Sequence, residues 1–250
     1  MTPITERRAA FRALHQSGCF ALPNPWDGGT ALRLERAGFK AIASTSAGAA
    51  WALGKEDGEM SVDEVLEHLR FLCNVTNLPV NADFEAGFAD TAAGVGANVT
   101  RCIATGVAGL SIEDRNGASL YTLDEAVERI KAARAAIDRS GQNVVLVGRC
   151  EAYLMKTLNM GEVIARLRAY SVAGADCLYA PGLKEIDDIA RVVKSVDKPV
   201  NANLTATGLS IADMAAVGVR RVSVGAALAR ATYAAFNGFV ELLRDKGKLP

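Results

Sequence analysis

The sequence is poor in the side chains that most metal-binding and nucleophilic motifs require. Among its 250 residues it contains only two histidines, His15 and His68, and five cysteines. The cysteines are scattered, odd in number and never spaced as Cys-x-x-Cys; they are Cys19, Cys73, Cys102, Cys150 and Cys177. This distribution argues against a disulfide framework, a zinc site of the Cys/His type and a histidine-based catalytic triad. We expect reduced, mostly buried thiols.

The chain also lacks an excess of one charge and a long apolar run. Lys plus Arg and Asp plus Glu both number 28, so the formal net charge is zero. Nothing in this balance attracts nucleic acid or an anionic membrane, and no apolar run is long enough to span a bilayer. The opening segment MTPITERRAAFRALHQ is too charged for the apolar part of a signal peptide. We therefore expect a cytoplasmic protein without nucleic-acid or membrane partners.

The sequence does contain a regular alternation of short apolar runs and amphipathic segments. The runs that resemble strands are 20–26, 41–46, 79–84, 109–113, 144–150, 177–181, 199–204 and 220–225. The segments between them include 61–72 and 122–137, each beginning with Ser or Thr three residues before Glu, which is a capping-box signature. Eight strand–helix units in this length predict an α/β fold, a single TIM (β/α)8 barrel over residues 1–250. A doubly wound sheet is the alternative.

Polar residues gather where the predicted strands end, which is the catalytic edge of a TIM barrel. Asp83 and Glu85 follow the third strand, Glu113 ends the fourth and Arg149 ends the fifth. Neighbouring carboxylates repel one another unless one is protonated or a cation lies between them. Because no histidine or thiolate ends a strand, the expected cation is Mg²⁺, which prefers oxygen ligands. The alternative is a structural one, in which these residues cap helices and form ion pairs at the rim.

Five segments, taken in order, resemble motifs of the isocitrate lyase and phosphoenolpyruvate mutase superfamily. They are TSAGAAWALGKEDG (45–58), ADFEAGF (82–88), SIEDR (111–115), VGRCEAYL (147–154) and ANLTATG (202–208). The resemblance covers nearly the whole chain. It implies a TIM barrel whose last helix, roughly 227–246 here, is exchanged between subunits of a homodimer or homotetramer.

The resemblance also implies roles for individual residues. Asp83, Glu85 and Glu113 match the family's acidic Mg²⁺ site, for which Mn²⁺ is an alternative ion, with contacts often made through water. Arg149 matches the arginine that contacts the pyruvyl or phosphonate portion of the substrate, and Asp57 matches an aspartate at the edge of the site. These two are the expected catalytic residues.

The substrate-binding residues implied by the resemblance come from two other segments. Thr45, Ser46 and Ala47 match the segment that holds the carboxylate of a 2-oxo acid, and Asn203 matches a polar contact to the ligand. The implied function is a Mg²⁺-dependent lyase or decarboxylase that acts on a small 2-oxo or 2-hydroxy carboxylic acid through a pyruvate enolate.

The sequence departs from the family in the segment after the fourth strand. Residues 115–122, RNGASLYT, lack the Cys, Lys and His with which relatives deliver a proton or close the site, and Gly182 stands where the lyases have a glutamate. Decarboxylation fits this departure best, because solvent can protonate the enolate that remains. Two alternatives stay open: C–P bond chemistry on a phosphonopyruvate-like substrate, and a metabolite-binding protein without turnover.

Overall fold

A computed structural model describes residues 1–204 and 208–249. Its main sheet has eight strands in the order β1-β10-β9-β8-β7-β4-β3-β2, and every pairing is parallel. The strands are β1 (Phe20–Leu22), β2 (Ile42–Ala43), β3 (Val80–Asp83), β4 (Gly109–Glu113), β7 (Val145–Arg149), β8 (Cys177–Tyr179), β9 (Val200–Asn203) and β10 (Arg221–Ser223). Each lies inside one of the eight predicted runs. The TIM barrel is therefore confirmed, and the doubly wound sheet is wrong.

The barrel is nearly closed between its first and second strands. The Ala43 N–H at the end of β2 donates to the carbonyl of Pro23, 3.0 Å away, just beyond the end of β1. Proline has no N–H to offer a ladder, and here it follows the strand rather than interrupting it. Closure brings the carboxyl ends of all eight strands to one mouth.

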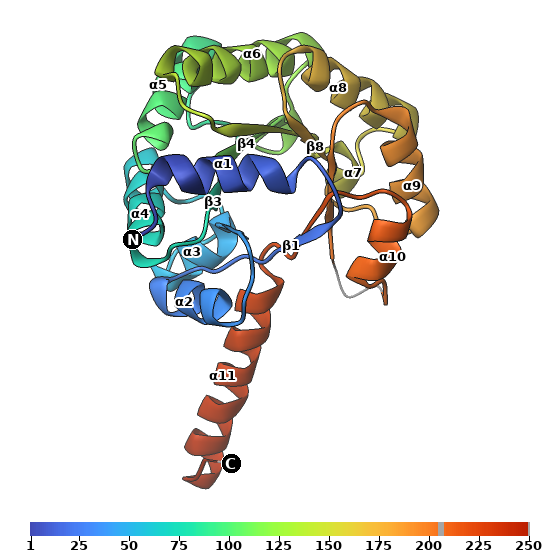
Figure 1. Ribbon diagram of the computed structural model, residues 1–250. Coiled ribbons are helices and arrows are strands. Elements are labelled where there is room, and N and C mark those ends of the chain that lie inside the picture. Colours follow the sequence, from blue (N-terminus) through green and yellow to red (C-terminus); the bar gives the residue numbers. More distant parts are fainter. Residues whose placement is uncertain (205–207, 250) are drawn as a thin grey trace.

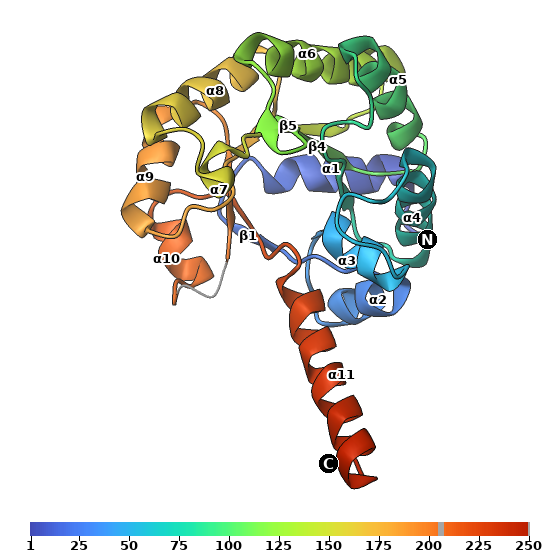
Figure 2. The same cartoon turned by 180° about the vertical axis from the view of Figure 1, so that it is seen from behind.

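Helices surround the sheet, as Figures 1 and 2 show from opposite sides. They are α1 (Ile4–Leu14), α2 (Gly28–Arg36), α3 (Ser46–Ala52), α4 (Val62–Val75), α5 (Ala92–Ile103), α6 (Leu123–Ser140), α7 (Ala152–Met155), α8 (Met160–Val172), α9 (Ile186–Ser195), α10 (Ile211–Ala216) and α11 (Ala227–Lys246). The capping boxes predicted at Ser61 and Thr122 are both present and begin α4 and α6. Within the described ranges, no helix combines the length and the apolar character needed to cross a membrane.

The segment 115–122 contains a small antiparallel hairpin. Its strands are β5 (Arg115–Asn116) and β6 (Ser119–Leu120), joined by a turn in which Gly117 has φ +59°. Glycine adopts this left-handed conformation without steric strain. The sequence-based reading of 115–122 as a loop missed this hairpin, because its two strands have only two residues each and carry no apolar alternation.

Helix α1 covers the amino-terminal end of the barrel (Figure 1). Phe11 is fully buried there and contacts Phe20 edge to face, with 6.3 Å between the ring centroids. Arg8, also buried, donates to the carbonyl oxygens of Val107 at 2.9 Å and Ile103 at 2.8 Å. These bonds satisfy carbonyls at the end of α5 and before β4, so α1 forms the floor of the barrel.

Helix α11 projects away from the barrel (Figures 1 and 2). Its bounds agree with the predicted last helix, roughly 227–246. Its surface carries exposed large apolar side chains, which are Leu228, Phe236, Phe239, Val240 and Leu243. Exposed apolar residues gathered in this way are typical of an interaction surface.

The fold predicts that Phe11→Ala destabilises the protein strongly. The substitution leaves a cavity at the barrel floor, and losses of this kind cost about 3–5 kcal/mol of unfolding free energy. Phe71→Ala is the control, because the Phe71 side chain is 54% exposed and its removal should cost less than about 1 kcal/mol. Urea denaturation measures both values; equal losses would show that Phe11 does not seal the barrel.

Candidate active site

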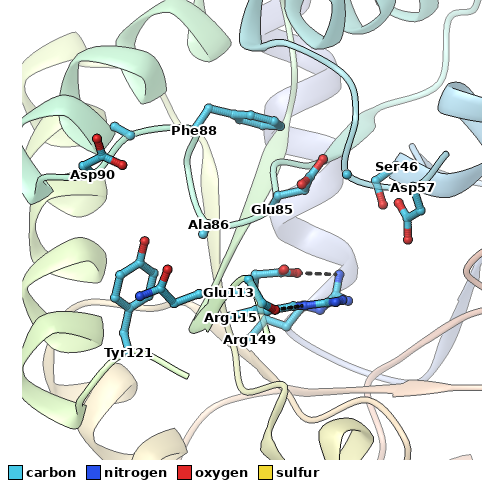
Figure 3. Close-up of a pocket in the computed structure, with 14 residues that line it drawn as sticks. Ser46, Asp57, Glu85, Ala86, Phe88, Asp90, Glu113, Arg115, Tyr121 and Arg149 are labelled. Carbon is cyan, nitrogen blue, oxygen red and sulfur yellow. Dashed lines mark hydrogen bonds and ion pairs between the residues drawn. The ribbon is translucent and has the colours of Figure 1, made fainter. Parts of the chain in front are cut away.

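Two adjoining cavities open at the carboxyl ends of the strands. The inner cavity, of about 270 Å³, lies over the barrel axis, and the outer cavity, of about 570 Å³, extends toward the β5–β6 hairpin. Ser46, Asp57 and Arg149 line both of them, so the two volumes form one site. Figure 3 shows the outer cavity with Glu85, Glu113 and Arg149 directed into it.

Arg149 lies at the centre of the acidic residues. Its Nη1 is 3.0 Å from Asp83 Oδ1 and 3.3 Å from Glu113 Oε2, and its Nε donates to Glu151 Oε1 at 2.6 Å. Tyr179 from the next strand places its ring centroid 5.4 Å from the guanidinium carbon. The structure therefore brings Asp83, Glu113 and Arg149 together at the strand ends, as predicted. Glu113 and Arg149 can be seen side by side in Figure 3.

The carboxylates outnumber the cations at this point, and burial makes their repulsion stronger. Burial, together with the nearby charges of Asp83 and Asp57, raises the pKa of Glu85 to about 7. Burial also raises the pKa of Glu113, against the opposing effect of Arg149. A further positive charge nearby would stabilise the ionised form of both carboxyl groups. Carboxylates therefore outnumber cations in the immediate surroundings of Arg149.

The segment after β2 orients Asp83. The Ser46 N–H donates to Asp83 Oδ2 at 3.1 Å, and the Asp83 N–H donates to Ser44 Oγ at 2.8 Å. Thr45 begins helix α3 and accepts a bond from the N–H of Gly48. Thr45, Ser46 and Ala47 all line the inner cavity, as the resemblance implies. Their role in holding a substrate carboxylate stays a prediction.

Asp57 and Asn203 both line the site, but not the same parts of it. Asp57 precedes α4 and lines both cavities, whereas Asn203 ends β9 and lines the inner cavity alone. Asn203 Oδ1 is buried and has no hydrogen-bond partner among the described residues, as expected of an atom that contacts a ligand. Residues 205–207 of the ANLTATG motif lie outside the described residues.

The predicted metal ligands do not form a closed cage. In ranges 1–204 and 208–249, no three His, Cys, Asp or Glu side chains are grouped closely enough to hold an ion by themselves. Arg149 lies between Asp83 and Glu113 and contacts both. The donors are all carboxylate oxygens with a surplus of charge, which suits Mg²⁺ bound largely through water. The acidic set fits a hydrated divalent ion and does not fit a tightly chelated one.

A second network, behind the site, went unrecognised in the sequence. Asp114 is buried and accepts bonds from Glu151 N at 2.8 Å, Tyr170 Oη at 2.6 Å and Arg166 Nη1 at 3.0 Å. Arg166 also donates to the carbonyl of Tyr121, beyond the hairpin. Asp114 thus fixes the backbone of Glu151, the side chain that orients Arg149. Its position in SIEDR, next to Glu113, was the available signal.

Comparisons with known proteins found similar sequences and structures along nearly the whole chain. The family model described as Phosphoenolpyruvate phosphomutase matches residues 11–244. A crystal structure of a protein from Burkholderia cenocepacia J2315 is 43% identical, with a TM-score of 0.95, covering 98% of this chain and 91% of that one.

Several relatives have named reactions. The 2-methylisocitrate lyase of Escherichia coli K12 is 33% identical over 71% of this chain and 62% of its own length. The oxaloacetate decarboxylase of Paraburkholderia xenovorans LB400 is 28% identical over 90% of this chain and 77% of its own length.

The network around Asp114 predicts that Asp114→Asn is strongly destabilising. The change removes the charge of the buried Asp114, which pairs with the 12%-exposed guanidinium of Arg166, and breaking a pair of this kind costs about 3 kcal/mol. Asp138→Asn is the matched control, since its pair with Arg134 is on the surface and is worth less than about 1 kcal/mol. Chemical denaturation measures both; a loss no larger for Asp114→Asn than for the control would contradict the positioning role.

Proposed function

Because the chain belongs to the isocitrate lyase and phosphoenolpyruvate mutase superfamily, we propose that it is a divalent-metal-dependent carbon–carbon lyase for a small 2-oxo or 2-hydroxy acid. The favoured reaction is decarboxylation of an oxaloacetate-like acid to a pyruvate enolate. The observation that carries this proposal is Arg149, which reaches both cavities from among Asp83, Glu113 and Glu151. A fixed cation at this point suits an anion that forms during the reaction.

The acidic residues supply the place for the metal. Asp83, Glu85 and Glu113 would hold Mg²⁺ or Mn²⁺, in large part through water. A bound divalent ion supplies Lewis-acid polarisation of the substrate's carbonyl and carboxylate oxygens. The raised pKa of Glu85 supports this assignment, since it marks a carboxyl group whose charge lacks compensation.

Arg149 stabilises the charge that develops on the substrate. Its orientation is held by Glu151 on one side and by Asp83 and Glu113 on the other, so no reorganisation is needed when the enolate oxygen forms. Thr45, Ser46 and Ala47 hold the substrate's carboxylate at the inner cavity, and Asn203 offers its unpartnered Oδ1 there. Asp57 closes the edge between the cavities.

The lining of the outer cavity favours decarboxylation over cleavage of a larger acid. Its described lining contains no Cys, His or Lys that could deliver a proton, and Asp90 adds a further negative charge. Loss of CO₂ needs no acid for the leaving group, and solvent can protonate the enolate. A tricarboxylic tail in this cavity would be repelled by Glu85, Asp90 and Glu113.

A second candidate is C–P bond chemistry on a phosphonopyruvate-like substrate. The sequence Arg149-Cys150-Glu151-Ala152 supports it, because it resembles the Arg-x-Glu-Ala of the mutase-like members of the family. In the structure, the Glu151 carboxylate accepts a bond from Arg149 Nε at 2.6 Å. It uses the same metal and the same arginine. A metabolite-binding protein without turnover is the third reading.

The proposal predicts Mg²⁺-dependent pyruvate release from oxaloacetate above the uncatalysed rate. The panel also contains methylisocitrate, isocitrate, 2,3-dimethylmalate and phosphonopyruvate. EDTA should abolish turnover, and Asp83→Ala and Arg149→Ala should each lower kcat/KM by about 10²-fold or more. Asp63→Ala, on the exposed surface of α4, should retain activity.

Each outcome of this assay selects one reading. Turnover of phosphonopyruvate alone would replace decarboxylation with C–P chemistry. No turnover across the panel, with oxalate still bound in the presence of Mg²⁺, would favour the metabolite-binding reading. Turnover that survives EDTA and both site substitutions would refute the proposed mechanism.

The partner of α11 is proposed to be a second copy of the chain, in a homodimer or homotetramer with the helix exchanged. Support comes from the exposed Phe236 and Phe239 and from a groove of about 460 Å³ at the base of the helix, lined by Trp26, Leu34 and Leu228 among others. The expected cytoplasmic location and the absence of nucleic-acid and membrane partners stay predictions from the sequence.

Helix exchange predicts that charge on the apolar face of α11 breaks the oligomer. The double substitution Phe236→Asp and Phe239→Asp should lower the mass measured by light scattering after gel filtration to that of a monomer, near 26.3 kDa. Lys246→Asp, a charge change at the end of the same helix, is the control and should leave the mass unchanged. A wild-type monomer would contradict the exchange.

A further inference from the structure

A second arginine lies deep in the barrel, beneath the acidic residues. Arg221 begins β10, is only 3% exposed and lies next to Phe11 of the floor helix. Its Nε donates to Asn201 Oδ1 at 2.9 Å, and its Nη1 is 3.4 Å from both Asn81 Oδ1 and His15 Nε2. None of these contacts is a carboxylate.

The histidine among these partners is neutral. Burial, together with the positive charge of Arg221, lowers the pKa of His15 to about 3. His15 Nδ1 lies 2.8 Å from the carbonyl of Phe11, so the ring donates there and keeps Nε2 as an acceptor for Arg221. The guanidinium is therefore solvated by neutral dipoles alone.

In the described part of the chain, the ion pairs inside the barrel all belong to Arg149. Arg221 shares none of them, and burial lowers its pKa, with no carboxylate opposing this effect. Burying an unpaired charge is costly, and proteins offset that cost with a counter-ion or a complete set of hydrogen bonds. Arg221 has neither from the protein, since no described residue accepts a bond from Nη2.

The unpaired guanidinium faces space rather than packed side chains. Arg221 lines the inner cavity, and the side chains nearest it in sequence and pairing are neutral: Asn81, Asn201 and Ser223. Charged residues also line this cavity, which are Asp57, Asp83, Arg149, Lys184 and Arg230, but Arg221 forms no ion pair with either aspartate. The cavity, of about 270 Å³, has the volume of roughly nine water molecules. It continues upward to Arg149, so a small solute at the mouth can reach Arg221.

We propose that Arg221 forms an anion-binding subsite on the floor of the inner cavity, for one carboxylate-sized monovalent anion. The subsite is separate from the Arg149 site, where carboxylates of the protein already surround the guanidinium. The anion can come from either of two sources. One is a free ion such as a halide or formate, and the other is the second carboxylate of a dicarboxylic substrate. The latter source rests on the proposed function, whereas the subsite itself does not.

Bromide is the probe for this subsite. The Tm of the wild-type protein is measured against bromide concentration, with fluoride, which is more strongly hydrated and harder to desolvate, keeping the ionic strength constant. Wild type should show saturable stabilisation, and Arg221→Met should weaken the apparent bromide affinity about 10- to 100-fold, the value of one or two charged hydrogen bonds. Arg220→Met, at the neighbouring position outside the barrel, should respond as wild type does.

A second measurement needs no variant, in case Arg221→Met does not fold. Crystals of the wild-type protein soaked in bromide should give an anomalous peak beside Arg221.

Competition in the same crystals identifies the source of the anion. Displacement of the bromide peak by malonate but not by acetate identifies the second carboxylate of a diacid, and a peak that persists against both identifies a free anion. No peak at Arg221, or an equal Tm response in Arg221→Met and wild type, overturns the proposal. Because neither readout involves turnover, failure here is distinct from failure of the pyruvate-release assay.

Discussion

The pairing of β7 with its two neighbours is the constraint on which the site depends. Its register sets Arg149 directly opposite Glu113 of β4 and Tyr179 of β8. Because β3 pairs with β4 in the same parallel sense, Asp83 comes within 3.0 Å of the same guanidinium. A slip of one residue in any of these pairs would turn the side chain to the outer face of the barrel and dismantle the site.

The interior of the barrel separates charge along its axis. Carboxylates in excess surround Arg149 at the mouth, whereas Arg221 lies near the floor among neutral groups. A polar interior of this kind is unusual for a (β/α)8 barrel, whose centre is normally filled by branched apolar side chains. The apolar packing is instead found at the floor, where Phe11 and Phe20 meet, and in the layer between sheet and helices.

Much of the architecture could be predicted because its signals are local. The apolar runs and the capping boxes at Ser61 and Thr122 are visible in short windows of sequence, and both were confirmed. The bounds of the last helix, which the family resemblance implied, agree as well. The residues at the strand ends could be named because a barrel brings those ends together. The roles of Asp114, just beyond the fourth strand, and of Arg221, inside the eighth, were missed because neither residue has a visible partner in the sequence. Their partners, Tyr170 and Asn201 among them, are distant in the chain.

The sequence by itself therefore determined the barrel, the family and the set of acidic and basic residues at its mouth, since each follows from a periodic pattern or an ordered series of motifs. Only the tertiary structure decided how these residues share their charges. It shows that Arg149 occupies the space between Asp83 and Glu113, that Asp114 fixes the backbone of Glu151, and that Arg221 is left without a counter-ion. The reason is that pairing and burial depend on distances between segments, which no local pattern encodes.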